Sequence, residues 1–442
     1  MKTLFSFCMT VFILTTSLAA QETVPDSLTV RTDSTFILDS VIIIGNTRTK
    51  SYVIRAEISL QQGTRFTPEL LEYEQNRIYS LGLFNRVQLH ILPKLEKKAD
   101  IVVEVNERWY IFPFPVIGLR DRDWKKLYYG GGLLHSNFRG RNEKIFGMVV
   151  LGYDPAVEVS YRTPFLSLDG GYLGEVRFAF QKVRNRSLAA QQLSNSFDER
   201  HIAGTLSIGK RFDTHQTVWI TVGFESVEIS EYQPGRTIST SGKDRYPFFG
   251  ASYTYDTRDL FEYPSMGTFM KFSVRKYGIP SQALDFVRYA ADLRRYVPLV
   301  PNFVLTGRLF TDLVAAGITP TYNRVYLGYA ERIRGHFKEV REGENLVGIS
   351  AELHYPFFQP VYLNLTFLPT EFSILRFGIV AAAFSDAGTV WFRHHPFAIN
   401  SFTKGYGVGI HFLLPYSMIL RTDYAWNEAR RGEFILDLGT SF

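Results

Sequence analysis

The chain has 442 residues, of which 45% are hydrophobic, 21% charged and 15% aromatic, and its formal net charge is +6. Its lysines and arginines are scattered among carboxylates without a basic run, which argues against nucleic-acid binding. No stretch of about 18 apolar residues follows the first 20 residues, so a helical membrane protein is excluded. The high aromatic content is typical of a membrane β-barrel with aromatic girdles, although an aromatic-rich soluble β protein has the same composition.

The first 20 residues have the parts of an export signal. Lys2 supplies the positive charge, Leu4–Leu14 is apolar, and residues 17–20 (Ser-Leu-Ala-Ala) offer a small-residue cleavage site. The only cysteine, Cys8, lies inside this segment. We therefore expect a mature chain without disulfides and without a cysteine-based metal site. Residues 21–35 are polar and rich in Thr, Ser and Asp, which predicts a linker.

Residues 36–108 are expected to form one small α+β domain. The first predicted elements are a strand over Phe36–Ile44 and a helix over Lys50–Leu60. A second helix begins at Thr67-Pro68, with Thr67 as N-cap, and ends near Gly82. Its mainly apolar stripe consists of Leu70, Tyr73, Arg77, Ile78 and Leu81. Two more strands are predicted over Phe84–Leu92 and Asp100–Val105.

Residues 110–442 alternate in character with a period of two. Apolar residues occupy positions 218, 220, 222 and 224, and the same pattern recurs over 408–414 and 434–442. Alternate side chains of a strand face opposite sides, so one face is apolar and the other is small or charged, as in a transmembrane β-barrel. A soluble sandwich also alternates; the small and polar second face distinguishes the barrel. At roughly 20 residues per strand and connection, the region predicts an antiparallel barrel of about 16 strands.

Several segments resemble the BamA/TamA superfamily of outer-membrane insertases and translocases. The N-terminal domain is similar to one POTRA domain in its residues 45–49 (GNTRT), 81–84 (LGLF) and 103–107 (VEVNE). In the barrel region, residues 137–140 (NFRG) resemble the family's turn after the first strand, and residues 255–259 (YDTRD) resemble another shared segment. The resemblance implies a bacterial outer-membrane barrel with its POTRA domain in the periplasm.

The strongest similarity is at residues 333–337, where Ile333-Arg334-Gly335 matches the Arg-Gly tip of a loop that folds back into the lumen. The family resemblance also places Glu352 and the segment from Phe384 to Gly388, which includes Asp386, on the inner wall, and the period-two count allows both carboxylates to point into the lumen. An arginine fork matches a carboxylate with two parallel bonds, so we expect Arg334 to pair with Asp386, Glu352 or both. Gly335 suits a tight loop tip. A porin-like wall charge is the alternative interpretation of Arg334.

The resemblance also implies a function. The first strand, expected near Leu127–Leu134, and the last strand would meet in a weak seam where a client strand could pair with an exposed edge. The last strand and its aromatic terminal signal contain Phe434, Leu436, Leu438 and Phe442. Unfolded outer-membrane or secreted proteins are the expected clients, with membrane lipid and periplasmic or lipoprotein accessory proteins as further partners. The alternatives are a secretion pore for one exported partner and a passive channel.

No enzyme motif stands out. The sequence has no Gly-x-Ser-x-Gly elbow and no His-Glu-x-x-His pair, and we expect no cofactor. His394-His395 is predicted to lie in a loop. The glycine-rich stretch over residues 405–409 fits a strand with small lumen-facing residues better than a nucleotide-binding loop. Asp256, Asp259 and Asp386 are conceivable as an acid–base set, but we do not expect catalysis.

Overall fold

The computed structural model describes residues 35–119, 124–167, 171–184, 198–230, 232, 235–279 and 283–439. The predicted export signal, residues 21–34 of the predicted linker and Phe442 lie outside the described residues. Within those residues, no helix is both long enough and apolar enough to span a membrane.

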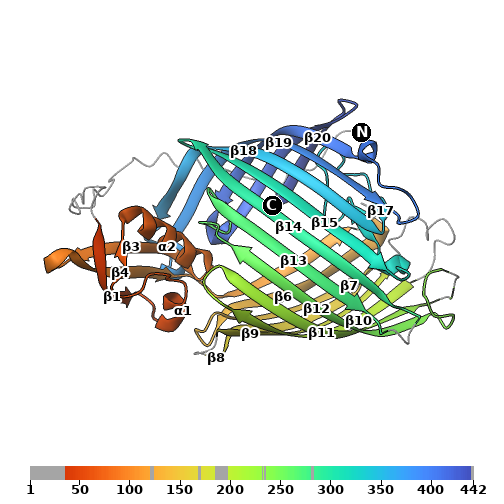
Figure 1. Cartoon of the computed structure of the whole chain (residues 1–442), viewed down its shortest axis with the longest axis horizontal. Helices are drawn as coiled ribbons and strands as arrows, with labels where there is room; N and C mark the ends of the chain where they lie inside the picture. The colour runs from red at the N-terminus through yellow and green to blue at the C-terminus, as the bar shows by residue number, and fades with distance from the viewer. Residues whose placement is uncertain are drawn as a thin grey trace.

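The N-terminal module is a four-stranded sheet covered by two helices (Figure 1). Its elements are β1 (Phe36–Ile44), α1 (Ser51–Arg55), β2 (Arg65–Phe66), α2 (Pro68–Ser80), β3 (Phe84–Pro93) and β4 (Lys98–Glu107). The strand order is β2-β1-β4-β3, and β1 pairs with β4 in parallel. Apolar residues of both helices and of the strands form one core that includes Leu38, Ile54, Ile78 and Phe84. The predicted element order is confirmed, and the two-residue strand β2 is added to it.

Two details of the helix prediction were wrong. The first helix ends at Arg55, because Glu57 and Ile58 donate to carbonyls three residues back and so tighten the chain into turns. In α2, the buried residues are Leu71, Glu74, Arg77, Ile78 and Tyr79, which is a face rotated from the predicted stripe. Glu74 turns inward because its carboxylate accepts the backbone N–H of Ser59. Thr67 is the N-cap residue, but its side chain makes no capping bond.

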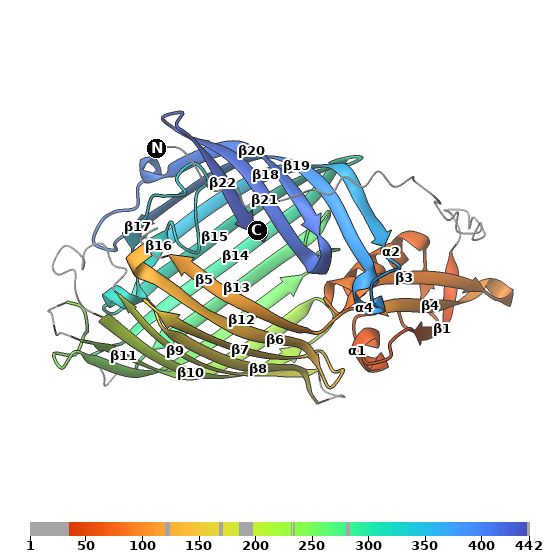
Figure 2. The same cartoon turned by 180° about the vertical axis from the view of Figure 1, so that it is seen from behind.

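The rest of the chain forms a sixteen-stranded antiparallel sheet that curls into a barrel (Figures 1 and 2). Its strands are β5 (Ile111–Leu119), β6 (Leu127–Phe138), β7 (Glu143–Gly152), β8 (Ala156–Ser167), β9 (Tyr172–Arg184), β10 (Asp198–Arg211), β11 (Gln216–Ile229), β12 (Lys243–Asp256), β13 (Gly267–Tyr277), β14 (Phe286–Val300), β15 (Phe303–Ala316), β18 (Asn345–Asn364), β19 (Ile374–Trp391), β20 (Thr403–Leu414), β21 (Met418–Asn427) and β22 (Gly432–Leu438). The predicted mainly β architecture and strand number are confirmed.

The period-two pattern sorts side chains as expected. Ile220, Val222 and Phe224 of β11 lie exposed on the outer face, whereas charged residues such as Glu352 and Asp423 are buried inside. A band of exposed apolar side chains around a polar interior is the arrangement that a lipid bilayer requires.

The module packs against one end of the barrel, which we call the module end (Figure 2). Four turns at that end bond to it. The bonds are Lys50 N to Gly140 O (2.9 Å), Arg77 Nη2 to Thr214 O (2.5 Å), Phe261 N to Ser80 Oγ (3.1 Å) and Asn85 Nδ2 to Glu371 O (2.7 Å). Glu371 lies in the short helix α4 (Thr370–Ser373). These contacts leave the long loop between β15 and β18 at the opposite end.

The first barrel strand is β5, not the segment near Leu127–Leu134, which belongs to the second strand β6. Residues 137–140 accordingly end β6 and follow the second strand. The prediction did not include β5, which contains Pro113 and Pro115, residues that are uncommon inside a strand. Prolines are tolerated on an edge strand, and β5 is the edge of this sheet.

Candidate functional site

The loop between β15 and β18 folds back into the barrel. Its stem is a two-stranded ladder of β16 (Val325–Leu327) and β17 (Arg341–Gly343). The segment Ile333–Phe337, which we call the loop tip, lies between these strands. Ile333 packs in a small core with Phe310, Leu327 and Leu346, and a Cβ on Gly388 would lie 2.8 Å from its Cδ1. The absence of a side chain at Gly388 therefore lets the tip approach the wall.

Arg334 contacts both of the carboxylates predicted for it. Its Nε and Nη2 donate to the two oxygens of Asp386 on β19, at 2.7 and 2.8 Å, and its Nη1 donates to Glu352 Oε2 on β18 at 2.5 Å. All three side chains are at most 8% exposed. Two parallel bonds to one carboxylate fix the guanidinium plane, and the second carboxylate fixes its rotation within that plane.

Two further residues complete the surroundings of Arg334. Asp423 on β21 has its Oδ2 3.5 Å from Arg334 Nη1, and the guanidinium lies over the ring of Phe384 with its carbon 3.4 Å from the ring centroid. The sequence prediction missed Asp423, although alternation on β21 places it on the same face as Arg421. Only the strand register shows that this face meets the loop tip.

Glycines of β20 make room for the tip and its partners. A Cβ on Gly405 would lie 1.6 Å from the carbonyl oxygen of Arg334, and one on Gly407 would lie 2.6 Å from the ring of Phe384. The glycine-rich stretch is therefore a strand with lumen-facing glycines, as predicted. Gly335 itself has a φ of +94°, a backbone conformation that favours glycine. A Cβ at this position would lie 2.7 Å from the carbonyl oxygen of Trp426.

A second layer of the cluster lies toward the module end. His354 Nε2 is 2.5 Å from Glu352 Oε1, and His411 Nε2 is 3.3 Å from Asp423 Oδ1. Arg421 donates to Asp423 at 2.7 Å. The prediction did not include His354, His411 or Arg421 as site residues. The sequence feature that indicates two of them is spacing: His354 lies two positions from Glu352, and Arg421 lies two positions from Asp423, so each pair shares one face of its strand.

The turn between β12 and β13 connects this layer to the module. Tyr263 reaches into the lumen, where its hydroxyl lies 3.0 Å from His411 Nδ1 and its ring lies 4.8 Å from that of His354. Three residues earlier, Leu260 is buried in the core of the module. One turn therefore contacts both the module and the lumenal cluster.

The loop tip also contacts the last two strands. The backbone N–H of Phe337 donates to Glu433 Oε1 of β22 at 2.7 Å, and its ring packs against Phe384, Ala425 and Ile435. His336 Nε2 lies 2.7 Å from Glu428 in the turn before β22. His336 and Phe337 thus tie the loop tip to the end of the sheet.

The sheet has two edges, β22 and β5, and among the described residues no ladder joins them. Gly439 N donates to Ile419 O at 2.7 Å. Because hydrogen-bonded pairs alternate along an antiparallel ladder, the backbone N–H and C=O groups of residues 433, 435 and 437 point toward β21. The backbone groups of Phe434, Leu436 and Leu438 consequently point to the open edge. Their side chains are exposed on the outer face.

The open edge of β5 lacks an N–H donor at two of its positions. Ser136 N donates to Tyr110 O at 2.9 Å, so residues 112, 114, 116 and 118 pair with β6, while 111, 113, 115 and 117 point to the open edge. Pro113 and Pro115 have no N–H, so two consecutive edge positions offer only carbonyls. The carbonyl of Ile111 is already bound by the indole N–H of Trp109.

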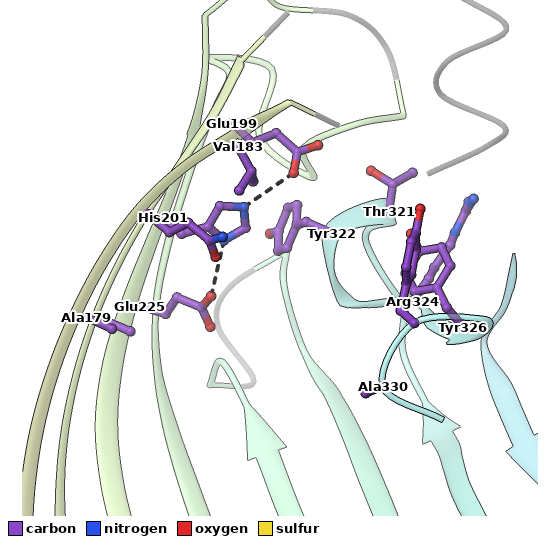
Figure 3. A pocket seen from close by; sticks show the side chains of 13 residues that line it. Ala179, Val183, Glu199, His201, Glu225, Thr321, Tyr322, Arg324, Tyr326 and Ala330 are labelled. Atoms are coloured by element: carbon purple, nitrogen blue, oxygen red, sulfur yellow. Dashed lines mark hydrogen bonds and ion pairs between the residues drawn. The ribbon is translucent and has the colours of Figure 1, made fainter. Parts of the chain in front are cut away.

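A polar cavity of about 430 Å³ lies between the wall strands β9 to β11 and the stem of the loop (Figure 3). His201 stands between Glu199, 3.3 Å from its Nε2, and Glu225, 3.6 Å from its Nδ1. Tyr322 lies beside His201, with the ring centroids 6.0 Å apart, and Tyr326 lines the loop side of the cavity (Figure 3).

Asp256, Asp259 and Asp386 each have a separate hydrogen-bonding partner. Asp256 is paired with Arg258 at 2.7 Å, and Asp259 accepts the hydroxyl of Ser265 at 2.6 Å in the same turn. Asp386 is held by Arg334. His394 and His395 lie in a loop, as predicted, and both are exposed.

Two family models match the chain. The Omp85 superfamily domain matches residues 137–442, and the POTRA model, described as surface antigen variable number repeat, matches residues 36–108. Outer membrane protein assembly factor BamA of Nitratidesulfovibrio vulgaris is 22% identical over 338 residues, which cover 73% of this chain and 40% of that protein. Protein TOC75-3, chloroplastic, of Arabidopsis thaliana is 22% identical over 390 residues, covering 71% and 45%. The chain thus spans less than half the length of these relatives.

Solved structures show the same fold at low sequence identity. BamA from Haemophilus ducreyi lacking POTRA domains 1–3 superposes with a TM-score of 0.53 and 15% identity, covering 91% of this chain and 83% of that one. CdiB from Escherichia coli gives a TM-score of 0.58 and 11% identity, covering 91% and 74%.

Proposed function

Because the chain belongs to the Omp85 superfamily and has a POTRA domain, we propose that it inserts or translocates other proteins at the bacterial outer membrane, with the POTRA domain in the periplasm. The observation that carries the proposal is that no ladder joins the edges β22 and β5 within the part of the chain that the structure describes, while the lumenal loop tip is bonded to β22. An unpaired strand edge is a template for another strand, so an unfolded client can add to it by β-augmentation.

The two edges differ in what they offer a client. The edge of β22 presents both N–H and C=O groups at Phe434 and Leu436, whereas that of β5 lacks donors at Pro113 and Pro115. A client strand needs alternating donors and acceptors to form an antiparallel ladder. The client strand therefore pairs with β22, while β5 closes the seam loosely and separates at low cost.

The loop tip belongs to the same function. It contacts β18 and β19 through Arg334 and β22 through Phe337, so it connects the seam strand β22 to the wall strands β18 and β19. A bidentate arginine held by buried carboxylates has one well-defined position. In this role the tip supports β22 when β5 separates from it. A loop bonded across the lumen also argues against a passive channel.

The POTRA domain offers a second edge. In its sheet order, β3 is a terminal strand of ten residues. In the periplasm, this edge is suited to bind an extended client segment or an accessory protein by the same pairing. Membrane lipid is the remaining partner, in contact with the exposed apolar band of the barrel.

A disulfide across the seam tests the proposal. Cysteine pairs are scanned between residues 433–437 of β22 and 113–117 of β5, and the best-forming pair is compared with its reduced form in a client assembly assay. We expect the oxidised protein to lose assembly and to regain it on reduction, with ion conductance unchanged. A pair at Leu206 and Val222, register partners within the wall, is the matched control. Full assembly by the locked barrel would exclude the seam as the client's route.

A further inference from the structure

Glu352, His354 and His411 form a set of metal-binding side chains that the protein-insertion role leaves unexplained. Their ligand atoms lie within 4.8 Å of one another, and each side chain is at most 6% exposed. We propose that these three residues bind one divalent transition-metal ion inside the barrel, and that zinc is the ion they fit best. Two imidazoles and one carboxylate are donors that zinc accepts, and three protein ligands leave a fourth position open.

The distances between the donor atoms suit a small ion. Glu352 Oε1 is 2.5 Å from His354 Nε2 and 4.0 Å from His411 Nδ1. Ligands on tetrahedral zinc, with bonds of about 2.0–2.1 Å, lie about 3.3 Å apart. The first of these contacts must open and the second must close, each by less than about 1 Å. The third pair of donor atoms, on His354 and His411, lies within 4.8 Å and must close toward the same separation. The ion would take the place of the hydrogen that now joins Glu352 to His354.

The fourth direction is covered by Tyr263. Its hydroxyl lies 3.0 Å from His411 Nδ1, and its ring lies beside that of His354. The phenol oxygen, or a water bonded to it, is placed to be the fourth ligand. Because Tyr263 comes from a turn that also contacts the POTRA domain, metal binding would tie that turn to the wall strands β18 and β20.

Neighbouring groups orient two of the ligands. Glu352 Oε2 is held by Arg334 at 2.5 Å, which leaves Oε1 facing the histidines. His411 Nε2 lies 3.3 Å from Asp423 Oδ1, the carboxylate–histidine arrangement that supports a metal-bound imidazole. Arg421 Nε is also 3.3 Å from this nitrogen. A metal on Nδ1 selects the tautomer in which Nε2–H donates to Asp423, and Arg421 then retains its own bond to that carboxylate at 2.7 Å.

The charges of the cluster favour a cation. It contains three carboxylates (Glu352, Asp386 and Asp423) and two guanidinium groups (Arg334 and Arg421), so one negative charge is in excess when both histidines are neutral. A buried uncompensated charge is costly. A proton on a histidine balances this charge, and a divalent ion reverses it to one net positive charge, so metal and proton compete for the same place.

His201 provides a matched control within the same lumen. It also stands between two carboxylates, Glu199 and Glu225, but each contacts a different ring nitrogen (Figure 3). The two carboxylates therefore lie on opposite sides of the imidazole and cannot converge on one ion.

The test is metal binding by the full chain in detergent, which does not depend on the protein's role in insertion. The protein is stripped with a chelator and titrated with Co²⁺, whose visible absorption reports coordination by nitrogen and oxygen, and then with Zn²⁺ in competition. We expect one equivalent per chain, a spectrum of a four- or five-coordinate ion, and its loss when Zn²⁺ is added. His354→Gln and His411→Gln should each weaken binding by at least about 100-fold, whereas His201→Gln should not.

The controls separate this site from surface binding. A His394→Gln/His395→Gln variant removes the exposed histidine pair and should bind as the wild type does. Failure of the stripped wild-type barrel to take up Co²⁺ or Zn²⁺ would overturn the proposal, and this measurement needs no variant to fold. Equal binding by a folded His354→Gln/His411→Gln variant, checked by heat-modifiable gel mobility, would also overturn it and show an adventitious ion only.

Discussion

The carbonyl oxygen of Arg334 lies directly against Gly405, so that a Cβ on this glycine would be 1.6 Å from it. Arg334 and Gly405 are 71 positions apart in the chain (405 − 334), yet they approach so closely that no side chain fits at position 405. Anchoring of the lumenal loop thus depends on the absence of a side chain at Gly405 as well as on the charges of Arg334 and its partners.

Gly405→Ala should detach the loop tip. The new methyl group cannot coexist with the Arg334 carbonyl, and moving the backbone separates the guanidinium from Asp386 and Glu352. We expect the loop to become sensitive to protease added from outside and client assembly to fall at least several-fold. Gly307→Ala on β15, where a Cβ would meet nothing within 4 Å, is the matched control. Equal protease resistance in the two variants would contradict this prediction.

Arg334→Ala should destabilise the folded barrel without preventing its insertion. It leaves two or three buried carboxylates without their partner, which costs on the order of 3–5 kcal/mol in a dry site and less where water enters the lumen. The measurement is the unfolding midpoint by heat-modifiable gel mobility, together with client assembly. Arg341→Ala, a more exposed arginine of the same loop, is the control. A wild-type midpoint and normal assembly in Arg334→Ala would refute the anchoring role.

Pro113→Val/Pro115→Val should close the seam. The double substitution restores two N–H groups on the open edge of β5 and allows a ladder with β22. We expect higher cross-linking between cysteines on the two edges, a higher unfolding midpoint and slower client assembly. Ile117→Val on the same edge changes no donor and serves as the control. If cross-linking and assembly both stay at the wild-type level, the prolines have no part in the seam.

Lowering the pH should loosen the turn over residues 47–49 of the POTRA domain, which Glu107 holds by hydrogen bonds. Burial by itself raises the pKa of Glu107, but hydrogen bonds from Thr49, Thr47 and Arg48 outweigh it and hold the pKa below its ordinary value of 4.5. A lowered folded-state pKa means that the carboxylate stabilises the fold above about pH 4.5 and that this stabilisation is lost as the pH falls through the folded-state value.

Hydrogen exchange checks this pH dependence. Protection factors at Arg48 and Thr49, whose N–H groups donate to Glu107, are compared between pH 7 and pH 4, after correction for the intrinsic exchange rate. We expect protection to fall in the wild type and to be low and nearly constant in Glu107→Gln. Glu104→Gln, on the exposed side of the same strand, should behave as the wild type. Constant protection in the wild type would show that titration of Glu107 does not loosen this turn.

Local pattern alone determined much of this protein. Period-two alternation predicted a barrel of about sixteen strands, and the spacing of Glu352 and Asp386 within their strands put both carboxylates on the inner face. These features depend only on the alternation of side chains along an extended backbone, which is a property of neighbouring residues. The same kind of reading predicted the α+β module, but it placed the first barrel strand near Leu127–Leu134 and left out β5, whose two prolines are tolerated because that strand lies at an edge.

Only the tertiary structure decided which residues meet inside the barrel. Asp423, His411 and Tyr263 come from β21, β20 and a turn at the module end, and their approach to Glu352 and Arg334 depends on the relative register of the strands and on the path of two loops. Register and loop path are set by all the pairings around the closed wall together, so no single stretch of sequence encodes them. Alternation therefore determined which way each side chain points, and the closure of the sheet decided what each one touches.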